Sequence, residues 1–144
     1  MYNNNIAAVI PSRILYTMIR VVDLERSVDF YTNALGMTEL RIEDFTEGRF
    51  TLVFMGYGDE TTNAVIEPTY NWDQNNYQHG THYGHMALGV TDAHAACNRL
   101  ESMGVVIHRA PGPMMYAVDE TGHKEIIAFI EDPDGYKIEL IETH

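Results

Sequence analysis

The sequence predicts an α+β fold in which one strand–helix–strands unit occurs twice, because the two halves of the chain share a pattern. The segment Tyr16–Met37 begins with an apolar run, reaches an Asp seven residues after its start, and continues with apolar residues at helical spacing. The segment His85–Gly104 repeats this order with the same offset to its Asp. With 144 residues, 45% of them hydrophobic, the chain is long and apolar enough for one domain with a core.

In the first half, Thr17–Val22 is expected to form a strand, and a helix follows it. Asp23 is a residue type that caps helix N-termini, and Gly36 stands where a left-handed C-cap is favoured. Two further strands are expected at Phe50–Met55 and Ala64–Ile66, joined by a polar turn. The apolar stripe of the helix consists of Leu24, Val28, Tyr31 and Leu35.

The second half repeats these elements. Met86–Val90 is expected to be a strand, Asp92 an N-cap and Gly104 a C-cap. The strands Ile126–Ile130 and Tyr136–Ile141 follow. The tetrapeptide between them, Asp-Pro-Asp-Gly at 132–135, has the signature of a type I turn. The apolar stripe of the second helix consists of Ala93, Ala96, Cys97, Leu100 and Met103.

The repeat also predicts the domain organisation. We expect a single domain over residues 13–142, built of two modules at about 13–70 and 83–142. The polar and aromatic stretch 71–82 is the expected linker, and residues 1–12 are an N-terminal extension.

Composition excludes several classes of function. Nine Lys and Arg against 21 Asp and Glu give a formal charge of −12, which disfavours nucleic acids and anionic membrane surfaces as partners. No apolar run approaches the ~20 residues of a membrane-spanning helix, and no signal-peptide core is recognisable. The single cysteine excludes an intramolecular disulfide, and no nucleotide-binding or serine-hydrolase motif is present. We therefore expect a cytoplasmic protein.

The repeat brings ionisable residues to equivalent positions in the two halves. Tyr16 and His85 occupy the same place at the first strand, and Glu67 and Glu139 the same place at the last strand. A carboxylate in an apolar strand is costly to bury unless it is paired or bound to a metal. For either Glu alone, the alternative is a solvated face of an antiparallel sheet. Their shared position, together with a histidine, favours a metal or catalytic site.

Five motifs carry a resemblance to a known family: TMIRVVDLERSVDFYTNALGM, FMGYGDET, AVIEPTYNW, YGHMAL and IEDPDGYKIELIE. Together they span most of Arg13–Glu142, in the order and spacing of glyoxalase I, the lactoylglutathione lyase family of the vicinal-oxygen-chelate superfamily. The chain resembles its short, bacterial-type form. The resemblance implies two βαβββ modules and a homodimer whose active sites are shared between the chains.

The resemblance also implies a metal site and a reaction. Each site would hold one divalent ion, with Ni²⁺ favoured over Co²⁺ or Zn²⁺, through Glu67, His85 and Glu139. The reaction would convert the hemithioacetal of glutathione and methylglyoxal into S-lactoylglutathione, which detoxifies methylglyoxal. Glu139 would be the principal catalytic base, with Glu67 serving the other substrate epimer. The substrate-binding residues implied are Arg20, Asn71 and Lys124.

Tyr16 departs from the family pattern, which has His or Gln immediately before the Thr-Met of the first strand. A neutral phenol is a poor ligand, and its ordinary pKa near 10 makes the phenolate costly. We expect water to take the coordination position. There are two alternatives to water. Tyr16 binds the metal as phenolate, or the chain holds metal poorly. The last of these corresponds to another class of function on the same fold, a metal-poor small-molecule or thiol-conjugate binding protein.

Overall fold

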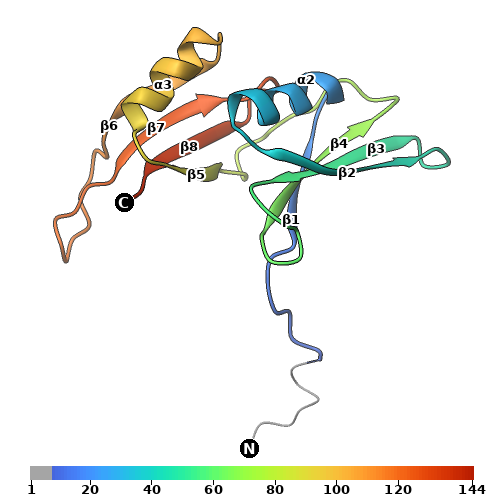
Figure 1. The fold of residues 1–144 in the computed structure, drawn as a ribbon, viewed down its shortest axis with the longest axis horizontal. Helices are drawn as coiled ribbons and strands as arrows, with labels where there is room; N and C mark the ends of the chain where they lie inside the picture. Colours follow the sequence, from blue (N-terminus) through green and yellow to red (C-terminus); the bar gives the residue numbers. More distant parts are fainter. Residues whose placement is uncertain (1–7) are drawn as a thin grey trace, which may run out of the picture. The chain divides into compact units, whose positions relative to one another are not determined.

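The computed structural model describes residues 8–144, and Figure 1 shows the order of its elements. The first seven residues of the expected N-terminal extension lie outside the described residues. The strands are β1 (Tyr16–Arg20), β2 (Thr38–Phe45), β3 (Phe50–Gly56), β4 (Val65–Asn71), β5 (Met86–Val90), β6 (Val106–Pro113), β7 (Ile126–Glu131) and β8 (Lys137–Glu142). The helices are α2 (Leu24–Asp29), the π-helical turn η1 (Phe30–Ala34) and α3 (Ala93–Ser102).

The chain divides into two compact units, each with one four-stranded sheet. Among the described residues, the first unit takes residues 8–24 and 36–75, and the second takes residues 25–35 and 76–144. Their strand orders are β1-β4-β3-β2 and β5-β8-β7-β6. In both sheets the first strand pairs parallel with the last, and the remaining pairs are antiparallel. The prediction of an α+β fold with a repeated βαβββ order is confirmed.

One strand of each sheet was not predicted from the sequence. The apolar runs located two strands after each helix, whereas the structure has three, because β2 and β6 precede them. Most side chains of β2 are exposed, and β6 alternates between exposed and half-buried positions. These edge strands therefore carry few of the consecutive apolar residues by which a buried strand is recognised. β4 also runs beyond its predicted end and includes Glu67 and Asn71.

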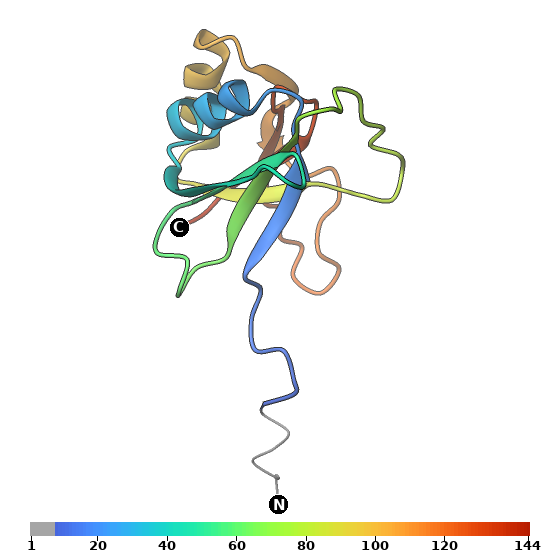
Figure 2. The same ribbon diagram turned by 90° about the vertical axis from the view of Figure 1, so that its right-hand side faces the viewer.

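The predicted caps at Asp92, Gly36 and Gly104 are confirmed. The Asp92 carboxylate accepts a hydrogen bond from Ala95 N at 2.9 Å, which satisfies a free N–H of the first turn of α3. Gly36 and Gly104 have φ of +72° and +83°, the left-handed conformation expected after each helix. Helix α3 packs on β6, β7 and β8. Figure 2 shows β1 in blue beside its partner β4 in green.

The predicted stripe of α3 is confirmed in its N-terminal part and wrong at its end. Ala93, Cys97 and Leu100 are buried, but Met103 is 46% exposed. Met103 is the C-cap residue of α3, where the regular helical spacing ends, so its side chain leaves the packed face.

A hydrogen-bonded carboxylate cluster fixes the segment 25–35 within the second unit. The Tyr31 hydroxyl donates to Asp132 Oδ2 at 2.7 Å, and Asp132 Oδ1 accepts the backbone N–H groups of Asp134 and Tyr136 at 2.9 Å. Burial raises the pKa of Asp132 even though these hydrogen bonds lower it. Burial likewise raises the pKa of Tyr31, with the charge of Asp132 adding to the effect. The predicted turn is present, with Gly135 N donating to Asp132 O at 3.0 Å.

Within residues 8–144, no helix is both long enough and apolar enough to cross a membrane.

Candidate active site

Four of the predicted site residues share one face of the first sheet. In the parallel pairing of β1 with β4, Tyr16 lies opposite Val65 and Arg20 opposite Thr69, with Glu67 between them along β4. Side chains alternate along a strand, and paired positions point to the same side. Tyr16, Arg20, Glu67 and Asn71 therefore point to the same side of the sheet.

Glu67 is a buried carboxylate. Only 6% of the residue is exposed, and its Oε1 accepts a hydrogen bond from the Thr69 hydroxyl at 3.1 Å. The alternative of a solvated strand face is therefore wrong for this residue. Because burying a carboxylate in an apolar strand is costly, its position calls for a charged or metal partner in the working protein.

Tyr16 lies at the edge of the same sheet. Its side of β1 is open enough to leave the residue 46% exposed, and its ring meets the Phe54 ring edge-on, with centroids 5.2 Å apart and planes at 80°. Phe54 and Glu67 lie on neighbouring strands between the paired positions Leu52–Thr69 and Met55–Ile66. Tyr16, Phe54 and Glu67 thus form one cluster on this face.

In the second sheet, His85 and Glu139 are in contact. His85 precedes the first residue of β5, and its Nε2 lies 3.2 Å from Glu139 Oε1. The two side chains are 39% and 14% exposed. The His85 ring meets the Phe129 ring edge-on, with centroids 4.9 Å apart and planes at 87°. Phe129 pairs directly with Glu139 across β7 and β8.

The two sheets hold these groups in the same register. Tyr16 lies opposite Val65, two residues before Glu67. His85 precedes Met86, which pairs with Ile138, so it lies beside the residue two positions before Glu139. The first-strand residue and the carboxylate therefore recur at equivalent places, as the repeat in the sequence predicts. The phenylalanine ring recurs with them, which was not predicted from the sequence.

The donor types suit a divalent transition-metal ion. Imidazole nitrogen and carboxylate oxygen are common ligands of zinc, nickel and cobalt. The convergence of His85 Nε2 and Glu139 Oε1 brings two such donors together in one unit. Among residues 8–144, no group of three or more His, Cys, Asp and Glu side chains is arranged to hold a metal. The residues thus fit a metal as two half-sites, each with one carboxylate.

The predicted substrate-binding residues occupy three different environments. Arg20 is exposed at the end of β1, and Asn71 is half-buried at the end of β4. Lys124 is exposed in the loop between β6 and β7, outside both sheets. Asn71 is the last residue of β4 and Phe50 is its partner in the antiparallel pairing, so the expectation that the linker begins at Asn71 is wrong.

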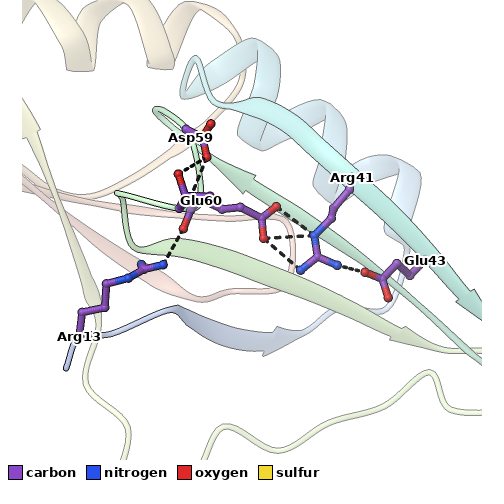
Figure 3. Close-up of polar contacts among 6 residues, drawn as sticks. Arg13, Arg41, Glu43, Asp59 and Glu60 are labelled. Atoms are coloured by element: carbon purple, nitrogen blue, oxygen red, sulfur yellow. Dashed lines mark hydrogen bonds and ion pairs between the residues drawn. The ribbon is translucent and has the colours of Figure 1, made fainter. Parts of the chain in front are cut away.

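Sequence reasoning missed an arginine on each sheet. Arg41 pairs with Phe54 across β2 and β3, and Arg109 pairs with Phe129 across β6 and β7; a register shift precedes each arginine. Both arginines stand five residues after the glycine that ends a helix, Gly36 or Gly104. That common offset is the signal that would have identified them. Figure 3 shows Arg41 with its carboxylate partners.

Comparison with known proteins identifies relatives over nearly the whole chain. Residues 13–140 match the model of the Glyoxalase/Bleomycin resistance protein/Dioxygenase superfamily. A lactoylglutathione lyase of Neisseria meningitidis serogroup B is 52% identical over 130 residues, covering 90% of each chain.

Two solved structures are similar in fold and sequence. The trypanothione-dependent glyoxalase I of Leishmania major is 44% identical, with a TM-score of 0.77 over 92% of this chain and 87% of that chain. Glyoxalase I of Zea mays is 39% identical, with a TM-score of 0.83 over 91% of this chain, which spans 44% of the maize chain. Because the family model spans all but the ends of the sequence, the chain belongs to the glyoxalase/bleomycin resistance protein/dioxygenase superfamily.

Proposed function

We propose that the protein is a lactoylglutathione lyase, which converts the hemithioacetal of glutathione and methylglyoxal into S-lactoylglutathione. The observation that carries the proposal is the repeated half-site, in which Glu67 and Glu139 lie at equivalent positions of two sheets and His85 contacts one of them. The relative from Neisseria meningitidis serogroup B, which is 52% identical, is named lactoylglutathione lyase. Methylglyoxal detoxification is the corresponding cellular role, and we assign it to the cytoplasm, where thiols are kept reduced.

Glu67, His85 and Glu139 would hold the divalent ion, which we propose to be nickel. When bound, the ion supplies Lewis-acid stabilisation of the negative charge that develops as the substrate carbon loses its proton. The family's remaining ligand position falls on Tyr16. In our proposal water occupies that position, with the Tyr16 hydroxyl beside it. The donor set alone does not select nickel over cobalt or zinc, and the preference rests on resemblance to the short form of the family.

Glu139 acts as the principal base. Its carboxylate takes the proton from C1 of the hemithioacetal, and the same proton returns to C2. The proton of the C1 hydroxyl passes to the C2 oxygen, so C1 becomes the thioester carbonyl and C2 the alcohol. General-base catalysis by a positioned carboxylate contributes typically ~10²–10⁴-fold. Glu67, at the equivalent position of the first sheet, serves the other substrate epimer.

The substrate's thiol portion is recognised by polar residues of the first sheet. The Arg20 guanidinium is suited to a glutathione carboxylate, because guanidinium and carboxylate form charge-assisted hydrogen bonds. The Asn71 amide would add a neutral hydrogen bond on the same face. Lys124, exposed in its loop, is proposed as a further contact to the glutathione end.

We further propose a homodimer in which each active site takes one module from each chain. The sharing of each site between two chains can be tested by complementation, because Glu67→Gln inactivates the first module and Glu139→Gln the second. Mixing the two inactive variants after dissociation would place two wild-type modules together in one site of every mixed dimer. Random reassociation should then restore about a quarter of wild-type activity. No recovery, with exchange of subunits verified, would contradict sites shared between chains.

The proposed activity is tested by reconstituting metal-free protein with nickel, cobalt or zinc and following thioester formation from glutathione and methylglyoxal. We expect about one ion per active site and the highest turnover with nickel. Protein that takes up none of the three ions and forms no thioester would instead support the metal-poor binding protein.

A further inference from the structure

Arg41 lies on the same face of the first sheet as Tyr16 and Glu67. Its guanidinium carbon is 3.6 Å from the centroid of the Phe54 ring, the same ring against which Tyr16 packs edge-on. A guanidinium over an aromatic face is attracted by the ring quadrupole. The Phe54 ring is therefore in contact with Arg41 and with Tyr16.

Carboxylates fix the guanidinium in this place. Arg41 Nε donates to both Glu60 carboxylate oxygens, at 2.9 and 3.2 Å, and Nη2 donates to one of them at 3.0 Å. A second ion pair joins Arg41 to Glu43. Figure 3 shows that Arg13 also reaches this cluster, through a 3.0 Å hydrogen bond to the Glu60 carbonyl. The bidentate contact of Arg41 with Glu60 restricts the orientation of the guanidinium more than a single hydrogen bond would.

The second sheet has an arginine and a phenylalanine at equivalent paired positions, but its arginine is restrained by backbone carbonyls. The His85 ring packs edge-on against the Phe129 ring. Arg109 pairs with Phe129 across β6 and β7. Arg109 donates to the backbone carbonyls of Gly112 and Ile127 at 2.9 Å. A restrained arginine, an aromatic ring and an edge-on first-strand residue thus occur in both modules, and in the second the edge-on residue is His85.

Arg41 is close enough to the first half-site for charges to interact. Hydrogen bonds to Glu60 are the main cause that raises the pKa of Arg41, and the charges of Glu60, Glu67 and Tyr16 add to it. Loss of the Arg41 charge alone would therefore favour a divalent cation nearby. Loss of an orienting contact would instead weaken metal binding. The sign of the change in metal affinity therefore distinguishes an electrostatic role of Arg41 from an orienting role.

We propose that Arg41 is a positioning residue of the active site, which fixes the Phe54 ring and thereby orients Tyr16 beside Glu67. The inference rests on the proposed metal-dependent function. It assigns to this arginine a role that its exposed position, with 43% of the side chain accessible, would not by itself suggest.

The first test is a double-mutant cycle read as cobalt affinity by visible absorption. Arg41→Met keeps apolar contact with Phe54 but removes the cation and its hydrogen bonds. We expect it to weaken cobalt binding about tenfold, the lower end of the effect of losing an outer contact to a ligand, because the Tyr16 hydroxyl would no longer be held beside the water. In a Tyr16→Ala background the same change should alter affinity by less than about twofold, because coupled residues are not additive.

Arg49→Met is the matched control. Arg49 also binds a carboxylate with two nitrogens, Nε and Nη2 to Asp73 at 2.6 and 2.8 Å, and lies near an aromatic ring, Trp72. It belongs to the same unit, but its ion pair is with Asp73 and its ring contact with Trp72. We expect its cobalt affinity to equal that of wild type. Tighter or unchanged binding by Arg41→Met, or the same loss in the Tyr16→Ala background, would overturn the proposal.

The second test does not depend on metal. In metal-free protein, nuclear Overhauser effects between the Tyr16 and Phe54 ring protons report their edge-on contact. We expect these effects to weaken strongly in Arg41→Met and to persist in Arg49→Met. Their persistence in Arg41→Met refutes positioning. Absence of metal binding by the wild-type protein would instead refute the proposed function, while this measurement still decides the role of Arg41.

Discussion

Replacing Tyr16 by histidine should convert the first half-site into a copy of the second. Tyr16 and His85 stand at equivalent register positions, each two residues before the glutamate on the neighbouring strand. Each ring packs edge-on against a phenylalanine, at centroid distances of 5.2 and 4.9 Å. We therefore expect the new imidazole to lie against Phe54, with a ring nitrogen near Glu67, as His85 Nε2 lies 3.2 Å from Glu139.

The magnitude follows from what the substitution exchanges. The aromatic contact is worth ~0.5–1.5 kcal/mol and is largely retained, because histidine keeps an edge-on ring. Tyr16 is 46% exposed, so the smaller ring leaves no closed cavity. The gain is a neutral nitrogen ligand in place of water. Loss of a residue that merely supports a ligand changes metal affinity ~10–100-fold, so a direct ligand should tighten binding by at least ~10-fold.

The assay is a titration of metal-free Tyr16→His and wild-type protein with nickel and with zinc, followed by turnover at saturating metal. We expect tighter binding of both ions and a smaller change in turnover, because charge stabilisation depends on the ion more than on this one ligand. Tyr16→Phe is the control, since it keeps the ring without adding a ligand. Equal or weaker binding by Tyr16→His would mean that the phenol is itself a ligand or an adapted part of the site, and would refute water as the occupant of that position.

Three further outcomes are expected. Glu139→Gln should abolish most thioester formation while leaving the circular dichroism spectrum unchanged, because the amide keeps the shape and cannot accept the proton; near wild-type turnover would contradict the base assignment. Tyr31→Phe should lower the free energy of unfolding, measured in urea, by about 1.5–3 kcal/mol, because it removes a 2.7 Å hydrogen bond to buried Asp132. A loss of less than about 0.5 kcal/mol would argue against this hydrogen bond. Because burial raises the pKa of Asp132 above its unfolded value near 3.9, the stability that this group contributes is present below that value and is lost as pH rises through the folded pKa. The stability of wild type relative to Asp132→Asn should therefore fall as pH rises above about 4, and a constant difference would refute the raised pKa.

The repeat predicted the fold because it recorded positions as well as residue types. Asp92 and Gly104 mark the ends of α3 in the sequence as they do in the structure, since caps are chosen by local backbone chemistry. The edge strands β2 and β6 were missed because a strand with one exposed face and charged residues has no continuous apolar run.

The candidate site could be predicted only in part. The equivalence of Glu67 and Glu139 follows from counting along the chain, and both lie at matching register positions. The contacts of Arg41 could not be predicted, because its approach to Phe54 depends on a register shift in β2 that moves the strand by one position. The burial of Glu67 likewise depends on neighbouring strands that composition does not reveal.

The hydrogen bond between Tyr31 and Asp132 has a consequence for how the duplicated halves depend on each other. The two residues are 101 positions apart in the chain, yet both belong to the second unit. A fragment made of the second half alone would lack the Tyr31 hydroxyl that donates to Asp132, so the second unit needs a segment from the first half of the sequence. The contact also closes a long loop of chain, so we expect the packing of segment 25–35 onto the second unit to be a late event in folding.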